Sequence, residues 1–265
     1  MTINWIIFPA ILFFFLFIKI GYVLSVRLNT VKAKSLLFII SFIAAIPGIL
    51  FTLYYLHLFD NSEWFYNFRS VKFIELTAAG MGLLAGAFYG IICNKNKIYR
   101  ILITVFLCVW IYIPYVKSVA LPIPESDFSD NWSNNVCLQT TLSSCGPSCA
   151  ATLLKDFGID VSEKQLAKSC FTYQGGTEIW YIARVFRKYG FEVEFKKLSD
   201  LPSSLPAPSI AGVKIGKLGH FIPLIARKKD LYIVGDPLIG RKSYTKSELL
   251  KRYKFTGFYM MIKKK

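Results

Sequence analysis

The sequence predicts a bundle of membrane-spanning helices followed by an α+β domain in which helices pack on an antiparallel sheet. Apolar residues form long runs before Val116, whereas after Leu121 they form the short periodic patches of a globular domain. In that second part helical patterns come first and strand patterns follow, which is typical of an α+β fold. We therefore expect a transmembrane region at 1–118, a linker at 119–135 and a globular domain at 136–265.

The first part contains four apolar runs, each close to the roughly 20 residues that a helix needs to cross a bilayer. No Lys or Arg precedes the first run, which is also longer than a signal-peptide core, so an uncleaved helix is expected. These features predict an integral, multi-pass membrane protein whose partner is the lipid bilayer. The expected spans are residues 3–26, 35–59, 73–93 and 98–116.

Charges in the connecting loops predict the orientation of this bundle. Loops rich in Lys and Arg stay on the cytoplasmic side of a membrane. The loop between the second and third spans mixes Arg69 and Lys72 with Asp60 and Glu63. Both termini, and with them the globular domain, are therefore expected outside the cytoplasm. The two other loops carry basic residues and no acid, namely Arg27, Lys32, Lys34, Lys95, Lys97 and Arg100.

The globular domain shows start and stop signals for its elements. Apolar residues at helical spacing follow Ser144 and end at Gly158, and a further helix is expected at 178–189. The segments Ser162–Gln165 and Thr245–Glu248 are capping boxes and mark the starts of two more helices. Short apolar runs bounded by turn residues predict strands at 191–195, 209–213, 220–226, 231–234 and 258–262.

Cys145 is the main candidate for chemistry in this domain. It lies just before a helix, where unpaired N–H groups and the helix dipole favour a thiolate. The alternative is a buried structural cysteine. His220 is the one histidine of the globular domain, and an imidazole can take the thiol proton and later give it to a leaving amine. Together these residues are the minimum for thiol-based acyl transfer.

Asp236 and Gln139 extend this set. Asp236 follows the strand after His220, so neighbouring antiparallel strands could bring its carboxylate to the far nitrogen of the ring and fix the tautomer. The alternative for Asp236-Pro237 is a plain turn. Gln139 lies six residues before Cys145, and its amide together with the Cys145 N–H could form an oxyanion hole.

In this order the residues resemble the double-glycine peptidases, the cysteine peptidases that process bacteriocin leader peptides. The segment Cys137–Cys149 is similar to the nucleophile motif of that family, and Gly219-His220-Phe221 and Asp236-Pro237 follow in the family's order. The likeness covers about residues 136–262. It implies a papain-like fold, cleavage after a Gly-Gly pair in a leader peptide, and four roles: nucleophile for Cys145, general base and acid for His220, orienting group for Asp236 and oxyanion donor for Gln139.

The chain departs from the best-known members of that family, in which an N-terminal peptidase is fused to an ABC transporter. Here the peptidase-like segment follows the membrane helices, and no GxxxxGK[ST] phosphate loop is present. The segment Gly212–Leu218 is a near miss with the wrong spacing, so no ATP binding is expected. An exported protein as substrate, and a separate export machinery as partner, therefore stay open beside the leader peptide.

Two other functions stay open, a peptidase-like module that binds leader peptides without cutting them, and a thiol transpeptidase or amidase. The net charge of +16 is compatible with a protein that binds nucleic acid. The basic residues of the globular domain are scattered among acids, however, so no nucleic-acid partner is expected. No His/Cys cluster has zinc-ligand spacing, so neither a metal nor another cofactor is expected. In an extracytoplasmic domain Cys137 and Cys170 could form a disulfide.

Overall fold

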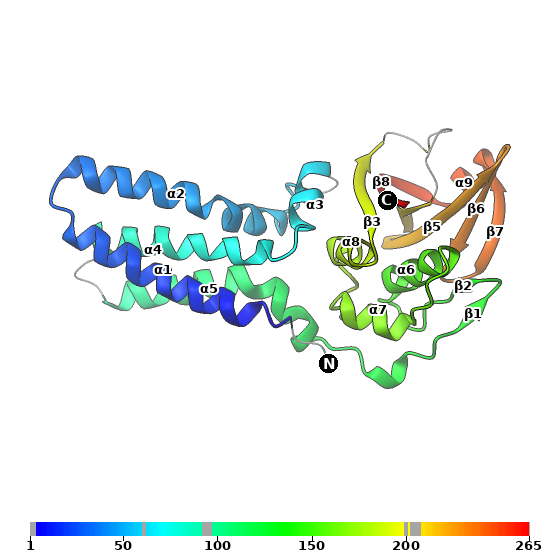
Figure 1. The fold of residues 1–265 in the computed structure, drawn as a ribbon, viewed down its shortest axis with the longest axis horizontal. Helices are drawn as coiled ribbons and strands as arrows, with labels where there is room; N and C mark the ends of the chain where they lie inside the picture. Colours follow the sequence, from blue (N-terminus) through cyan, green and yellow to red (C-terminus); the bar gives the residue numbers. More distant parts are fainter. Residues whose placement is uncertain (1–3, 60–61, 92–96, 199–200, 202–207, 265) are drawn as a thin grey trace. The chain divides into compact units, whose positions relative to one another are not determined.

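The chain folds into two compact units in the computed structural model (Figure 1). The helical unit comprises Asn4–Asp60 and Lys72–Val116, and the globular unit comprises Asn61–Val71 and Lys117–Lys265. In α5 the side chains of residues 109–114 are not described. The structure describes residues 4–59, 62–91, 97–198, 201 and 208–264.

Long helices make up the helical unit. Three of them, in the part of the chain that the structure describes, are long and apolar enough to cross a membrane, namely Ile7–Arg27, Val31–Tyr54 and Ile74–Ile91. The first two are α1 and α2, and the third joins the 3₁₀ helix η1 to α4. The expected end of that span at residue 93 lies outside the described residues. The bounds are α1 Ile7–Arg27, α2 Val31–Tyr54, η1 Ile74–Ala79, α4 Gly80–Ile91 and α5 Lys97–Ala120.

The prediction of four spans is corrected to three for the described residues. The expected fourth span does form a helix, α5, which is not among the three spans found in the described part of the chain. Its central side chains, at 109–114, lie outside the description.

Close backbone contact joins α4 to α1. Gly82, Gly86 and Gly90 recur at four-residue spacing on α4. A Cβ atom on Gly86 would lie 2.2 Å from the carbonyl oxygen of Ile18 in α1, and one on Gly82 would meet the carbonyl oxygen of Phe14 at the same distance. Small residues are therefore required here because the two helix backbones touch.

The globular unit contains a six-stranded antiparallel sheet in the order β3-β8-β4-β5-β6-β7. Helix α6 packs on β5, and α7 and α8 pack against α6 (Figure 1). The predicted α+β fold, with helices on an antiparallel sheet, is confirmed. The bounds are β3 Phe191–Lys197, β4 Ser209–Ile215, β5 Leu218–Lys228, β6 Leu231–Asp236, β7 Gly240–Thr245, β8 Lys254–Lys264, α6 Cys145–Asp156, α7 Glu163–Ser169, α8 Ile179–Lys188 and α9 Lys246–Arg252.

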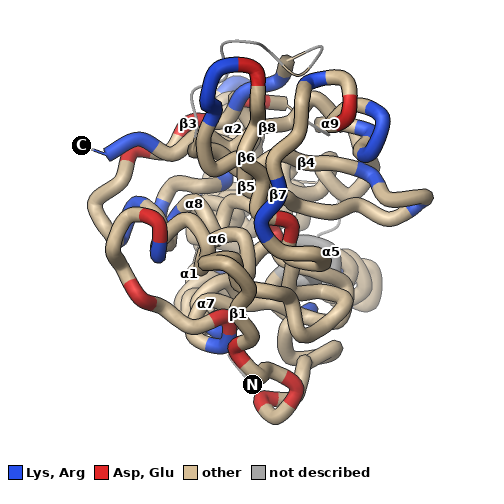
Figure 2. Tube along the Cα trace, turned by 90° about the vertical axis from the view of Figure 1, so that its right-hand side faces the viewer, with Lys and Arg blue, Asp and Glu red and all other residues tan. Residues whose placement is uncertain are grey.

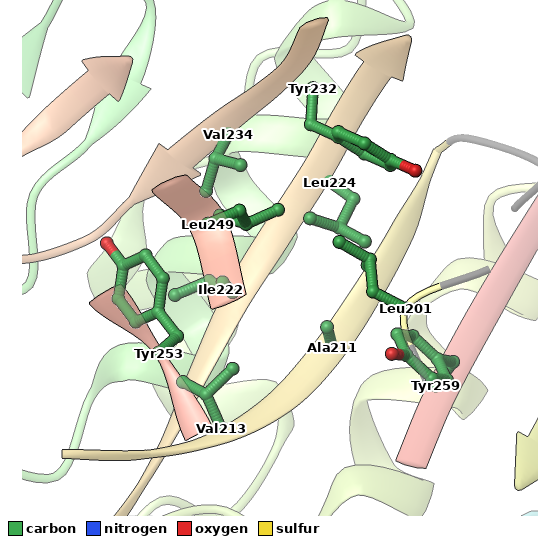
Figure 3. Packing of buried hydrophobic residues seen from close by; sticks show 10 residues of the cluster. All are labelled: Leu201, Ala211, Val213, Ile222, Leu224, Tyr232, Val234, Leu249, Tyr253 and Tyr259. Carbon is green, nitrogen blue, oxygen red and sulfur yellow. The ribbon is translucent and has the colours of Figure 1, made fainter. Parts of the chain in front are cut away.

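Both capping boxes are present as predicted. Ser162 and Gln165 begin α7, and Thr245 and Glu248 begin α9, each side chain bonding to the other residue's backbone N–H. By fixing where α9 starts, the second box places Tyr253 directly after the helix. Its ring lies in a buried cluster between the sheet and α9 (Figure 3), whose members are Leu201, Ala211, Val213, Ile222, Leu224, Tyr232, Val234, Leu249, Tyr253 and Tyr259.

Five short elements were not predicted from the sequence. Strand β7 has the polar sequence of an edge strand and pairs only with β6. The expected linker contains the 3₁₀ helix η2, Glu125–Asp127, and the strand β1, Trp132–Ser133, which pairs with β2, Val136–Cys137. Helix α3, Glu63–Arg69, lies in the segment expected to be a loop between two spans.

Helix α3 belongs to the globular unit, although α2 precedes it and η1 follows it in the chain. The ring of Tyr66 is buried, with ring centroids 6.2 Å from Trp180, 5.6 Å from Phe195 and 4.7 Å from Phe258. The Arg184 guanidinium donates a 2.6 Å hydrogen bond to the carbonyl oxygen of Arg69. The segment between the second and third apolar spans is thus part of the core of the globular unit.

Replacement of Tyr66 by alanine is expected to lower the free energy of unfolding by about 3 kcal/mol, because it leaves a cavity among three aromatic rings. Urea unfolding of the full-length protein in detergent, followed by tryptophan fluorescence, measures this change. Tyr189→Ala is the matched control, since Tyr189 ends α8 with a side chain that is 38% exposed. Equal losses in the two variants would show that α3 does not stabilise the unit.

Basic residues of the globular unit lie on several separate loops and strands, with acids between them (Figure 2). Some of them pair, as in Lys164 with Glu125 at 3.0 Å and Lys196 with Glu194 at 2.7 Å. Exposed pairs of this kind contribute little to stability. They break up the positive surface, in keeping with the scatter of charges along the sequence.

Candidate active site

Cys145, His220 and Asp236 come from three neighbouring elements. Cys145 is the first residue of α6, His220 lies in β5 and Asp236 ends β6. Because β5 pairs with β6 and α6 packs on β5, the three side chains gather at one place. His220 is 7% exposed and Asp236 is 2% exposed, whereas Cys145 is partly open to solvent.

The contact expected between neighbouring strands is present. Nε2 of His220 and Oδ1 of Asp236 lie 2.9 Å apart. The nearby Cys145 thiol also favours the protonated form of the His220 ring and so raises its pKa. The sulfur lies at the N-terminus of α6, the end at which a helix dipole favours an anion. The imidazole therefore stands between a thiol and a carboxylate.

Electrostatics favour a protonated ring. Burial opposes the charge, but the interactions with Asp236 and Cys145 outweigh it and raise the pKa of His220 from 6.5 to about 9. Burial likewise opposes the charge of Asp236, but hydrogen bonds from His220, Tyr253 and the Leu238 N–H lower the pKa of its carboxyl. The stability contributed by His220 is full below pH 6.5 and is lost as the pH rises through about 9.

Tyr253 supports Asp236 from the side opposite to His220. Its hydroxyl donates a 2.5 Å hydrogen bond to Oδ2 of Asp236 and accepts one from Nε of Arg252 at 3.2 Å. The backbone N–H of Leu238 donates to Oδ1 of Asp236 at 2.9 Å. Both carboxylate oxygens are thus engaged and the plane of the group is fixed. In the sequence Tyr253 was only the end of a helix, and nothing near it indicates this contact.

Gln139 lies in the loop before Cys145, as expected. Its backbone N–H donates to the carbonyl oxygen of Pro237 at 2.9 Å, which ties this loop to the turn after Asp236. Its side-chain Nε2 donates to the carbonyl oxygen of Thr141 at 2.8 Å. Its Oε1 is buried without a hydrogen-bond partner among the residues described. One amide proton is thus occupied within the loop.

Glu163, the first residue of α7, anchors the loop that precedes Cys145. It was not singled out from the sequence. The side chain is fully buried. Its carboxylate accepts hydrogen bonds from the Thr140 N–H at 3.1 Å, the Thr140 hydroxyl at 2.7 Å and the Ser148 hydroxyl at 2.9 Å. These bonds fix the chain on both sides of Cys145. The capping box at Ser162 gave the position of Glu163 but not its contacts.

Residues 133–265 match the sequence profile of the Peptidase C39 family. The chain belongs to this family. The match begins before β2 and includes all four candidate residues, so the resemblance inferred from the sequence is confirmed for the family. Several known proteins are similar to this chain over about half of its length.

Two relatives show how the matched share of the partner protein varies. The lactococcin-G-processing and transport ATP-binding protein LagD of Lactococcus lactis subsp. lactis is 30% identical over 125 residues, which are 46% of this chain and 18% of LagD. An uncharacterized protein of Methanothermobacter thermautotrophicus is 27% identical over 134 residues, 49% of this chain and 88% of that protein. This chain thus spans less than a fifth of LagD but most of the archaeal protein.

Two solved structures are also similar to about half of this chain. The peptidase domain of Streptococcus ComA, a bifunctional ABC transporter involved in a quorum-sensing pathway, has a TM-score of 0.44 and 25% identity, covering 49% of this chain and 98% of that domain. A double-glycine-motif protease from an AMS/PCAT transporter, solved with a leader peptide, has a TM-score of 0.42 and 23% identity, covering 49% and 91%.

The disulfide expected in the C39 domain is wrong, because Cys137 and Cys170 are both free and buried. Each thiol is enclosed in its own part of the core. The Cys137 N–H in β2 donates to Thr152 of α6, whereas Cys170 ends α7. Burial raises the pKa of Cys137 to about 12 and that of Cys170 further. Among the described residues no three His, Cys, Asp or Glu side chains form a metal site.

Proposed function

We propose that this chain is a membrane-anchored cysteine peptidase in which the Cys145 thiolate hydrolyses a peptide bond through an acyl-enzyme. The observation that carries this proposal is the buried His220–Asp236 pair beside the partly exposed Cys145 thiol. A pKa of about 9 keeps the ring protonated at neutral pH, ready to protonate a leaving amine. The family supports a peptidase, and this geometry supports the thiol mechanism.

Four residues have roles in the proposed reaction. The Cys145 sulfur attacks the carbonyl carbon of the scissile bond, and the Cys145 N–H with the Gln139 amide stabilises the oxyanion. The imidazolium of His220 gives its proton to the leaving amine, which departs and leaves a thioester. His220 then takes a proton from water, which attacks the thioester and releases the acid product. Asp236 holds the ring in place throughout.

The proposed substrate is a peptide with a Gly-Gly pair at the end of its leader. Its support is the resemblance of the nucleophile segment to double-glycine peptidases, together with a neighbour solved as a double-glycine-motif protease with a leader peptide. The distribution of loop charges supports a C39 domain outside the cytoplasm, which would make the substrate an exported peptide or protein. A separate export machinery would then deliver it.

This proposal is tested by incubating the full-length protein in detergent with a synthetic Gly-Gly leader peptide carrying a short cargo. We expect two fragments whose summed mass exceeds that of the substrate by one water, because the acyl-enzyme is hydrolysed. A matched peptide with Val-Val at the junction is expected to stay intact. Prior alkylation by iodoacetamide, verified at Cys145 by mass spectrometry, should stop the reaction.

Cleavage that continues after complete alkylation of Cys145 would contradict the thiol mechanism. A leader fragment that carries an added amine instead of water would indicate a transpeptidase. No cleavage, with tight retention of the leader peptide, would indicate a binding module.

A further inference from the structure

The helical unit contains an open cavity that the proposed peptidase reaction does not use. It has a volume of about 620 Å³ and lies between α1, α4 and α5. Tyr89 of α4 and Thr104 of α5 share a 3.0 Å hydrogen bond, and the Arg100 guanidinium of α5 lies 5.3 Å from the Tyr22 ring of α1. Apolar side chains and cations line it together, among them Phe15, Ile18, Val105, Lys19, Lys97 and Arg100.

The three cations have no acidic partner in the surrounding chain. Residues 1–59 and 76–124 contain no Asp or Glu. Glu75 lies in η1, before α4, whereas the cavity meets α4 near its other end, at Tyr89. Fourteen residues separate them, about 20 Å along a helix. The described residues of the helical unit therefore supply no countercharge beside these cations.

The contacts of Arg100 show that its guanidinium lacks an anionic partner among the described residues. Its Nε atom is buried and has no hydrogen-bond acceptor among the described residues. A guanidinium in apolar surroundings without an anion is costly, and the stack on Tyr22 offsets only part of that cost. A phosphate group matches the planar fork of Arg and accepts from neighbouring lysines as well.

We propose that this cavity binds one anionic phospholipid, with its phosphate at Lys19, Lys97 and Arg100 and an acyl chain along Phe15, Ile18 and Val105. Basic pockets between membrane helices commonly hold anionic head groups. The apolar wall argues for a lipid, because free phosphate would leave that wall uncovered. The proposal rests on the placement of α1 and α4 in a membrane, and it is independent of the chemistry at Cys145.

Native mass spectrometry of the full-length protein tests this site. The protein is delipidated and then incubated with phosphatidylglycerol or phosphatidylcholine. We expect one phosphatidylglycerol to be retained and phosphatidylcholine to be lost. Lys19→Gln with Arg100→Gln should reduce this retention about tenfold or more, because two of the phosphate ligands are gone. The matched control is Lys32→Gln with Lys34→Gln, which removes two charges in the first turn of α2, outside the lining of the cavity, and should retain the lipid.

A second variant keeps the cations and fills the apolar part of the cavity. Val105→Trp should also release phosphatidylglycerol. This variant still tests the proposal if circular dichroism shows that the double variant does not fold. Equal losses of phosphatidylglycerol in the two double variants would overturn the proposal, since general attraction between basic residues and the anionic lipid would then explain its retention. Equal retention of both lipids would overturn it as well, and so would displacement of phosphatidylglycerol by millimolar inorganic phosphate.

Discussion

Replacing Cys145 by alanine is expected to abolish cleavage of the leader peptide, with kcat lowered by at least about 10³-fold. The reason is chemical, because no other cysteine described in the C39 domain can take its place. Cys137, Cys149 and Cys170 are buried, and burial raises the pKa of each thiol. Single-turnover kinetics with excess full-length enzyme measure the change without interference from product release.

Cys170→Ala is the matched control for this experiment. It removes a buried thiol at the C-terminal end of α7. We expect its kcat to equal that of the unmodified protein, with a modest fall in melting temperature. If Cys145→Ala retained a rate within tenfold of the unmodified protein, Cys145 would not be the nucleophile.

Two substitutions at Asp236 are expected to separate its charge from its orienting role. In Asp236→Asn the side chain can still accept from His220, but a neutral amide no longer offsets the burial that opposes the charged ring. The pKa of His220 should fall from about 9 toward its ordinary 6.5. Because an unprotonated ring cannot protonate the leaving amine, the basic limb of kcat should move to lower pH.

Asp236→Ala should cost more, because it removes the acceptor that fixes the ring and leaves the Tyr253 hydroxyl without its partner. We expect kcat near neutral pH to fall about 100-fold or more. The measurement is the pH dependence of kcat for both variants beside the unmodified protein. An unchanged basic limb in Asp236→Asn would show that this carboxylate does not set the pKa of His220.

Local signals in the sequence were sufficient for most elements of the C39 domain. Capping boxes at Ser162 and Thr245 placed the starts of two helices because their hydrogen bonds involve residues only three apart. The strands followed from apolar runs between turns. Helix α3 was not predicted because its stability comes from a partner remote in the chain, Trp180. Strand β7 was not predicted because its sequence is polar, although its partner β6 is only a short turn away.

The candidate site shows the same difference between short-range signals and long-range contacts. Cys145 and His220 could be identified from residue type and position, and Asp236 from the order of strands. Glu163 and Tyr253 could not, because their hydrogen bonds to Thr140 and Asp236 span 23 and 17 residues. The disulfide prediction was wrong for a related reason, since chain position says nothing of the separate buried places of the two thiols.

The sequence by itself determined the family, the division into apolar helices and an α+β domain, and the residues able to do thiol chemistry. Each of these depends on residue type and short-range spacing. Only the tertiary structure decided how the site is supported and where charges lack partners. The contacts of Tyr253 with Asp236, of Tyr66 with Trp180 and of Arg100 with Tyr22 join separate elements, and such contacts form only when packing brings those elements together.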